Sequence, residues 1–106
     1  MHSTLIVARM QPESSEAVAK LFADFDRTEM PARMGTRRRQ LFSYQGLYFH
    51  LQDFDSDHGG EHIEQAKTDP LFVGISADLR PYIDAYDPNW RTPSDAMATR
   101  FYHWDE

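Results

Sequence analysis

Two residues with complementary chemistry, Arg39 and His50, are the first candidates for a functional site in this sequence. They lie in two β-rich runs, 37–44 and 47–54, which only Gln45-Gly46 separates, and this spacing predicts a hairpin with a two-residue turn. A histidine, whose ordinary pKa is about 6.5, can exchange protons at neutral pH. An arginine is a fixed cation that suits an enolate or carbonyl oxygen. The same residues are equally compatible with a histidine satisfied within the sheet and a surface arginine.

The register of this hairpin sorts its side chains onto two faces. It pairs Tyr44 with Leu47, Phe42 with Phe49, Gln40 with Leu51, and Arg38 with Asp53. It also sets Arg39 opposite Gln52 and diagonal to His50. We expect the face with Phe42, Tyr44, Leu47, Phe49 and Leu51 to be the core face. The other face is unusually polar for a strand pair and could line a wet cavity; it carries Arg37, Arg39, Leu41, Ser43, Tyr48, His50 and Gln52.

Asp26 is a further candidate, because it lies one helical turn after Phe22 in the last turn of a predicted helix. The negative end of the helix dipole disfavours a carboxylate there. A raised pKa and a role in proton transfer would explain this placement. A helix end that simply faces water explains it as well, and the residues alone favour that simpler interpretation.

Other chemistry has weaker support. His58 and His62, four residues apart with acidic neighbours, could hold a metal, but the adjacent Gly59-Gly60 favours a solvated link. The sequence has no cysteine, which excludes disulfides and thiolate sites, and it has none of the common nucleotide-binding or hydrolase motifs. Several aromatic residues could wall a pocket, although core or dimer contacts are more usual for such residues: Tyr82, Tyr86, Trp90, Tyr102 and Trp104.

The elements that would position these residues follow a βαββαβ order. The sequence predicts a strand over 4–10, a helix over 15–27, the hairpin, a short helix over 61–67, a helix opened by Asp69 and Pro70 and ending near Pro81, irregular chain, and a last strand over 96–104. This order is that of an α+β, ferredoxin-like antiparallel sheet with helices on one face. The second face needs a cover, and a homodimer that forms a barrel-like α/β pair would supply it. We expect residues 1–106 to form a single domain.

Composition narrows the class of protein. The net charge is −6 with one basic cluster, Arg37-Arg38-Arg39, so a nucleic-acid partner is not expected. No segment has the pattern of a signal peptide or of a membrane span, so no membrane partner is expected and a cytoplasmic protein is the simplest expectation.

Segments spread over nearly the whole chain resemble the small aromatic polyketide cyclases of the tetracenomycin and spore-pigment type. They are Leu5-Ile6-Val7-Ala8-Arg9-Met10, Phe22-Ala23 with Asp26, Glu29-Met30-Pro31 before Gly35, Arg38-Arg39-Gln40-Leu41-Phe42, Leu47-Tyr48-Phe49-His50-Leu51, Pro70-Leu71-Phe72, Tyr86-Asp87-Pro88, Trp90, Asp95-Ala96-Met97-Ala98-Thr99, Phe101-Tyr102 and Trp104. The resemblance implies a ferredoxin-like homodimer without metal or redox cofactor. It also implies an enzyme that closes rings in a poly-β-ketone from a type II polyketide synthase, whose acyl carrier protein and ketosynthase would be possible partners.

The resemblance implies catalytic roles for Asp26, Arg39 and His50. One departure limits it, because the tetracenomycin cyclase has a histidine directly before the aspartate where this chain has Phe25. The expected substrate-binding residues are Phe25, Leu41, Tyr48, Gln52, Tyr82 and Trp90. Two alternatives remain open: a cofactor-free monooxygenase of the same fold acting on an aromatic polyketide, and a non-catalytic chaperone subunit of the synthase.

Overall fold

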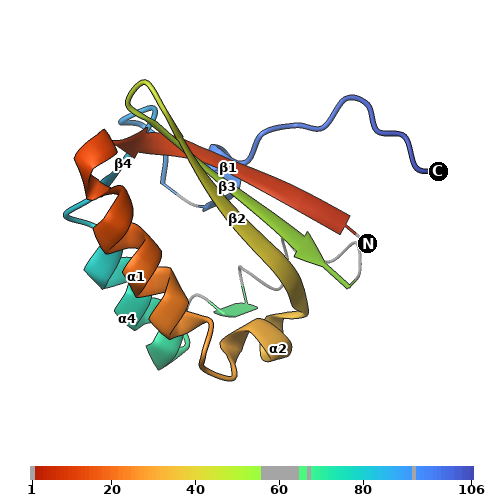
Figure 1. Cartoon of the computed structure of the whole chain (residues 1–106), viewed down its shortest axis with the longest axis horizontal. Coiled ribbons are helices and arrows are strands. Elements are labelled where there is room, and N and C mark those ends of the chain that lie inside the picture. Colours follow the sequence, from red (N-terminus) through yellow and green to blue (C-terminus); the bar gives the residue numbers. More distant parts are fainter. Residues whose placement is uncertain (1, 56–64, 67, 92) are drawn as a thin grey trace.

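A four-stranded antiparallel sheet with helices on one face organises the chain (Figure 1). The computed structural model describes residues 2–55, 65–66, 68–91 and 93–106. The elements are β1 (His2–Met10), η1 (Pro12–Ser14), α1 (Ser15–Phe25), α2 (Met30–Met34), β2 (Thr36–Tyr44), β3 (Leu47–Phe54), α4 (Pro70–Leu79), β4 (Ile83–Ala85) and η2 (Pro93–Ala96). The strand order β2-β3-β1-β4 is that of the predicted α+β, ferredoxin-like fold.

The hairpin forms with the predicted register. Gln45 and Gly46 have φ values of 47° and 81°, so both turn residues take the left-handed conformation of a type I′ turn. Arg39 pairs with Gln52 and Phe42 with Phe49, as expected. Because side chains alternate along each strand, Arg39, Tyr48, His50 and Gln52 emerge on the same face.

Local signals set the ends of the helices. The Asp69 side chain accepts a 2.9 Å hydrogen bond from the Leu71 amide, and Pro70 occupies the first turn, so α4 begins where the sequence predicts. α1 begins at Ser15 and buries Val18, Phe22 and Phe25 against the sheet. The short helix α2 was not predicted; it ends at Gly35, whose φ of 74° permits the turn into β2.

The prediction that the face with Phe42 and Tyr44 is the core face was wrong, whereas the polar face does line a cavity, as expected. The helices cover the polar face of the hairpin, so that Tyr48, His50 and Gln52 are buried. The face predicted to be the core is open, and Phe42 and Tyr44 are 50% and 61% exposed. The physical reason is that the polar side chains satisfy one another beneath the helices, which removes most of the cost of burying them.

The predicted last strand over 96–104 was also wrong in position. The fourth strand is β4, in the stretch predicted to be irregular, and it pairs with β1 through Ala8, Arg9 and Met10. The later segment makes one isolated bridge from Met97 to Ile6, and the Ala98 amide donates to the Leu5 carbonyl. Beyond this bridge, residues 98–106 leave the sheet without regular structure (Figure 1).

Two expectations fall on residues that the structure does not describe. His58 and His62 lie outside the described residues. Of the predicted short helix over 61–67, only Gln65 and Ala66 are described, and both are helical. Among the residues described, no helix is long and apolar enough to cross a membrane.

Candidate active site

A cavity of about 310 Å³ lies between the covered face of the sheet and the helices α1 and α4. One wall is polar and comes from Arg39 on β2 and from three residues of β3. The remaining walls are almost entirely apolar. The lining residues are Ile6, Ala8, Phe22, Phe25, Met34, Arg39, Tyr48, His50, Gln52, Phe72, Ile75, Ser76, Leu79 and Ile83. A pocket of this size and character suits a small, largely apolar organic ligand that a few polar groups orient.

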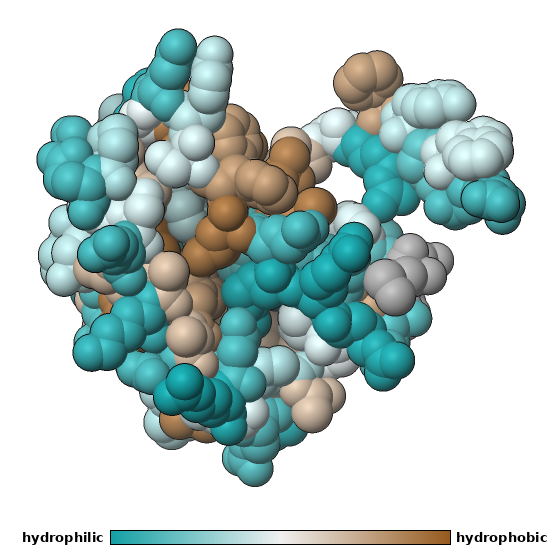
Figure 2. Space-filling model, viewed as in Figure 1, coloured by the Kyte–Doolittle hydropathy of each residue, from teal (hydrophilic) through white to brown (hydrophobic). Residues whose placement is uncertain are grey.

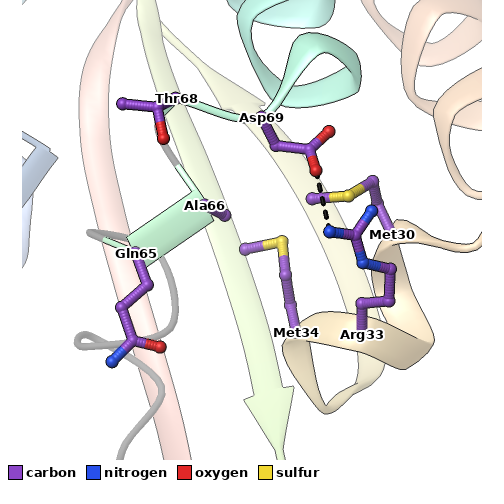
Figure 3. A pocket seen from close by; sticks show the side chains of 7 residues that line it. All are labelled: Met30, Arg33, Met34, Gln65, Ala66, Thr68 and Asp69. Carbon is purple, nitrogen blue, oxygen red and sulfur yellow. Dashed lines mark ion pairs between the residues drawn. The ribbon is translucent and has the colours of Figure 1, made fainter.

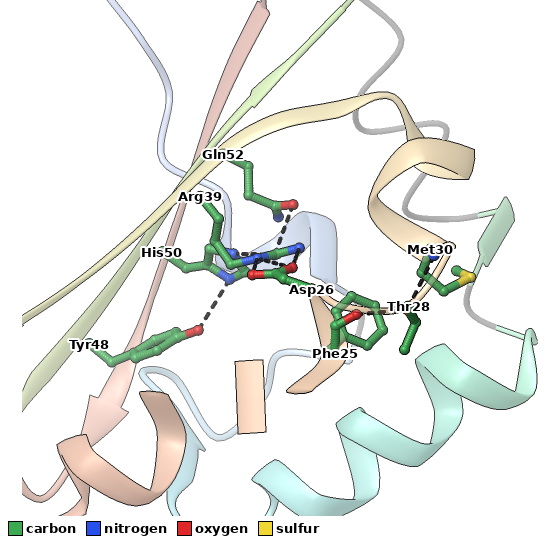
Figure 4. Close-up of polar contacts among 8 residues, drawn as sticks. All are labelled: Phe25, Asp26, Thr28, Met30, Arg39, Tyr48, His50 and Gln52. Carbon is green, nitrogen blue, oxygen red and sulfur yellow. Dashed lines mark hydrogen bonds and ion pairs between the residues drawn. The ribbon is translucent and has the colours of Figure 1, made fainter. Parts of the chain in front are cut away.

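Arg39 is the centre of the polar wall. Its side chain is only 8% exposed, and its Nε and Nη2 atoms donate to the Asp26 carboxylate at 2.9 to 3.1 Å. Its Nη1 atom donates to His50 Nε2 at 2.8 Å and to Gln52 Oε1 at 3.1 Å (Figure 4). The guanidinium also lies over the Phe22 ring, with 4.9 Å between Cζ and the ring centroid. Arg39 therefore ties the end of α1 to both strands of the hairpin.

Asp26 reaches this arginine because of how α1 ends. It is the C-cap residue of α1, and the next turn is closed by Thr28, whose hydroxyl donates to the Phe25 carbonyl and accepts from the Met30 amide. Asp26 does not simply face water, because its carboxylate chelates Arg39. The charge of the arginine offsets the unfavourable dipole at this helix end.

His50 is held on both sides of its ring. Arg39 Nη1 lies 2.8 Å from Nε2, and the Tyr48 hydroxyl lies 3.1 Å from Nδ1. The Phe22 ring packs against the imidazole edge-to-face at 5.0 Å. Burial, together with the nearby Arg39 charge, lowers the pKa of His50 to about 3, so the imidazole is neutral at physiological pH.

Tyr48 is buried beside His50, with 3% of its surface exposed. Burial raises the pKa of this tyrosine above its ordinary value, although the Arg39 charge acts in the opposite direction. The hydroxyl therefore stays protonated at neutral pH. It can donate a hydrogen bond but cannot serve as a base.

The structure brings some of the expected site residues together and leaves others apart. Asp26, Arg39 and His50 form one network, and Phe25, Tyr48 and Gln52 line the same cavity. Leu41 lines a separate small hollow beside α1, and Tyr82 lines another on the outer side of that helix. Trp90 packs on Tyr86 with 5.9 Å between ring centroids, away from the residues that line the cavity.

Sequence reasoning missed most of the apolar walls. Phe72, Ile75 and Leu79 recur at helical spacing in the predicted helix that follows Asp69 and Pro70, and in the structure they line the cavity as well as packing on the core. Their spacing was the available signal, and it predicts burial rather than contact with a ligand. The packing of the helix on the sheet determines which buried residues border a hollow. Local sequence patterns do not predict that packing.

A second hollow of about 320 Å³ lies between α2 and the start of α4 (Figure 3). An ion pair of 2.9 Å between Arg33 Nη2 and Asp69 Oδ2 crosses it. Met34 lines both this hollow and the cavity. In the described part of the chain, no group of three or more acidic, cysteine or histidine side chains could hold a metal ion.

The fold and the site define a class of small α+β proteins, in which a ferredoxin-like sheet keeps a ligand-sized cavity with one polar wall beneath its helices. Comparison with known proteins narrows this class. The model of the family described as "Polyketide synthesis cyclase" matches residues 2–105, and the chain belongs to that family.

Relatives from Streptomyces support this membership. The chain is 39% identical to the tetracenomycin F2 cyclase of Streptomyces glaucescens over 103 residues, which are 97% of this chain and 94% of that protein. It is 38% identical to the polyketide synthase CurG of Streptomyces cyaneus over 106 residues, 99% of this chain and 98% of that protein. The solved structure of the Streptomyces glaucescens cyclase superposes with a TM-score of 0.94 and covers 100% of this chain and 99% of its own.

A more distant similarity concerns the fold alone. The structure of a putative antibiotic biosynthesis monooxygenase from Caulobacter crescentus superposes with a TM-score of 0.57 at 18% identity, over 76% of each chain. The shared architecture carries no argument for oxygen chemistry in this protein.

Proposed function

We propose that this protein is an aromatic polyketide cyclase that directs the intramolecular aldol cyclisation and aromatisation of a poly-β-ketone from a type II polyketide synthase. The observation that carries the proposal is the cavity itself, in which a buried Arg39-centred network forms one wall and apolar side chains form the rest. Membership of the cyclase family supports the same conclusion.

The main task of an enzyme in this reaction is to select one ring closure among several. Methylene groups between two carbonyls are activated, so a poly-β-ketone cyclises spontaneously in several ways. A cavity that holds one folded conformation lowers one barrier by orientation, and a preference of about 1.4 kcal/mol already selects one product tenfold. The apolar walls exclude water and define the shape, while the polar wall can bind carbonyl oxygens.

The candidate catalytic residues take distinct roles in this proposal. Arg39 supplies a fixed positive charge beneath the polar wall, where negative charge develops on an enolate or alkoxide oxygen. Asp26 anchors Arg39 and could assist as an acid or base, being the partly exposed member of the network. His50, whose pKa is lowered to about 3, acts in its neutral form by accepting from Arg39.

The test is reconstitution with a minimal type II synthase, comparing product rings by mass spectrometry for the wild type, His50→Ala and Arg39→Ala. The proposal expects the wild type to change the ring pattern that the synthase gives alone, and both variants to lose part of that change. If no ring pattern depends on the wild-type protein, the cyclase proposal fails. Oxygen uptake with an anthrone substrate would instead support the monooxygenase alternative, and persistence of ring control in both variants would support a chaperone subunit.

We also propose that the protein works as a homodimer, with the open face of the sheet in the interface. This face carries Phe42 and Tyr44, which are exposed, and the less exposed Leu47, Phe49 and Leu51 beside them. Figure 2 shows the C-terminal segment standing away from the body of the molecule. That segment exposes three more aromatic residues: Phe101, Tyr102 and Trp104. A second copy of the chain would cover these aromatic groups.

We propose further that the substrate comes from the acyl carrier protein and ketosynthase of the synthase.

A further inference from the structure

The hydrogen bonds around His50 determine which of its ring nitrogens carries the proton. Arg39 can only donate, so His50 Nε2, at 2.8 Å from Nη1, must be the acceptor. The imidazole is neutral, because burial and the Arg39 charge lower its pKa to about 3. A neutral ring with an unprotonated Nε2 has its proton on Nδ1.

The same reasoning then determines the role of Tyr48. The Nδ1–H group of His50 donates to the Tyr48 hydroxyl oxygen at 3.1 Å, and this contact uses a lone pair of that oxygen. The hydroxyl hydrogen must therefore turn away from His50. Tyr48 makes no other hydrogen bond within the part of the chain that the structure describes, so its hydrogen has no protein acceptor there.

The Tyr48 hydroxyl lies at the cavity, where its free O–H group could donate to a bound ligand. Tyr48 is 3% exposed and lines the cavity together with its two polar neighbours, Arg39 and His50. Figure 4 shows the Tyr48 hydroxyl as one end of a series of contacts that runs through His50 to Arg39. Arg39, by contrast, spends one N–H of Nε, both of Nη1 and one of Nη2 on protein acceptors, so it has little capacity left for a ligand.

We propose that Tyr48 is the hydrogen-bond donor that this site offers to a substrate carbonyl oxygen, and that Arg39 and His50 are positioning residues that fix its orientation. The inference rests on the proposed cyclase function and names the group that touches the reacting atoms. In the aldol step, the enol carbon forms a bond to a ketone carbon and the C=O electron pair moves to oxygen. That oxygen then receives the proton that the enol hydroxyl loses, so Tyr48 stabilises the developing charge without being consumed.

Tyr48 suits this role better than an ionisable acid would. Because burial raises its pKa, it keeps its proton over the whole neutral range. Because His50 already donates to its oxygen, the O–H bond is polarised in the direction of the substrate. The charge of Arg39 acts through the imidazole, so one cation orients and strengthens a neutral donor.

The test has one structural and one functional measurement. In the wild-type protein, long-range proton–nitrogen NMR of the His50 ring should show a protonated Nδ1 and an unprotonated Nε2. In the reconstituted synthase, Tyr48→Phe should lower kcat for the directed ring closure at least about tenfold and change KM much less, because the missing bond matters most in the transition state. Thermal melting establishes that this variant is folded.

Tyr86→Phe is the matched control, because it removes the same atom from a half-exposed tyrosine outside the cavity. It should leave kcat unchanged. A protonated Nε2 in the NMR spectrum, or a folded Tyr48→Phe protein with wild-type kcat, would overturn the inference. The NMR result does not depend on whether the wild type cyclises its substrate, and the kinetic comparison applies to an active wild type. An inactive wild type would instead refute the proposed function and leave the NMR test of the ring tautomer in place.

Discussion

Arg39 provides the hydrogen-bond donors for several polar groups around the cavity. It satisfies the buried acceptors of His50 and Gln52 and pairs with the Asp26 carboxylate at the end of α1. Replacing it leaves these acceptors in a site that water reaches poorly. An unsatisfied buried polar group costs about 1 to 3 kcal/mol.

Arg39→Met should therefore lower the free energy of unfolding by about 2 to 4 kcal/mol, which urea denaturation would measure. Arg37→Met provides the control from the same strand. Arg37 pairs with Asp55 at 3.2 Å, but both side chains are more than half exposed, and such pairs are worth less than about 1 kcal/mol. Equal losses in the two variants would contradict the central role of Arg39.

The lowered pKa of His50 makes a prediction about acid stability. The imidazole binds a proton at about pH 6.5 in the unfolded chain but only at about pH 3 in the folded protein. Between these values the unfolded state holds more protons, so stability is complete above about pH 6.5 and falls as the pH drops toward 3. The slope from this one group cannot exceed about 1.4 kcal/mol per pH unit.

His50→Gln should flatten the dependence of the melting temperature on pH between about 5 and 6.5, where few carboxylates titrate. His103→Gln is the control, because His103 lies in the exposed C-terminal segment. A wild-type protein whose stability is constant over this interval would show that the imidazole is not buried in neutral form.

At the scale of elements, local signals explain what could be predicted. The Gln45-Gly46 turn determines the hairpin register, and the capping residue with its following proline determines the start of α4. These signals involve neighbours in sequence, so they can be recognised without knowing the fold. They place Arg39 and His50 on one face of the hairpin from the sequence alone.

What could not be predicted depends on partners distant in sequence. The sequence predicts the core on the opposite face, because the polar side chains of Tyr48, His50 and Gln52 favour burial only once Arg39 and Asp26 are known to satisfy them. Likewise, the alternation over 96–104 is that of a strand, but a strand also requires a ladder of hydrogen bonds to a neighbour, and this segment makes only the bridge at Met97 and the bond from the Ala98 amide in the described part of the chain. β4 is only three residues long, too short for a pattern of its own, and it depends on its pairing with β1.

The start of α4 gives a prediction at this scale. Asp69→Ala removes the acceptor for the Leu71 amide and should cost about 1 kcal/mol, measured as a lower melting temperature. Asp69→Asn keeps the cap and loses only the pair with the half-exposed Arg33, so its loss should be smaller. If the two variants melt alike, the cap does not stabilise α4.

At the scale of the whole molecule, the two faces of the sheet differ in what covers them. The helices cover one face, whereas the described residues leave the other open with aromatic side chains on it. Exposed apolar surface of this kind marks an interface in a folded protein. The proposed homodimer follows from this asymmetry and can be tested directly.

Size-exclusion chromatography with light scattering should give about twice the 12.4 kDa mass of the chain for the wild type and a monomer for Phe42→Glu. Val73→Glu is the control, because Val73 is equally exposed, at 49% against 50% for Phe42, but lies on α4. A monomeric wild type, or dissociation by both variants, would contradict an interface on the open face.

The separation of the cavity into one polar wall and several apolar walls has a practical consequence. The polar wall comes from the hairpin of β2 and β3, whereas Phe72, Ile75 and Leu79 all come from α4. A combinatorial library restricted to those three codons would reshape the space available to a folded ketide while the groups that contact oxygen stay intact. Engineering of new ring patterns in this scaffold can therefore begin from a single helix.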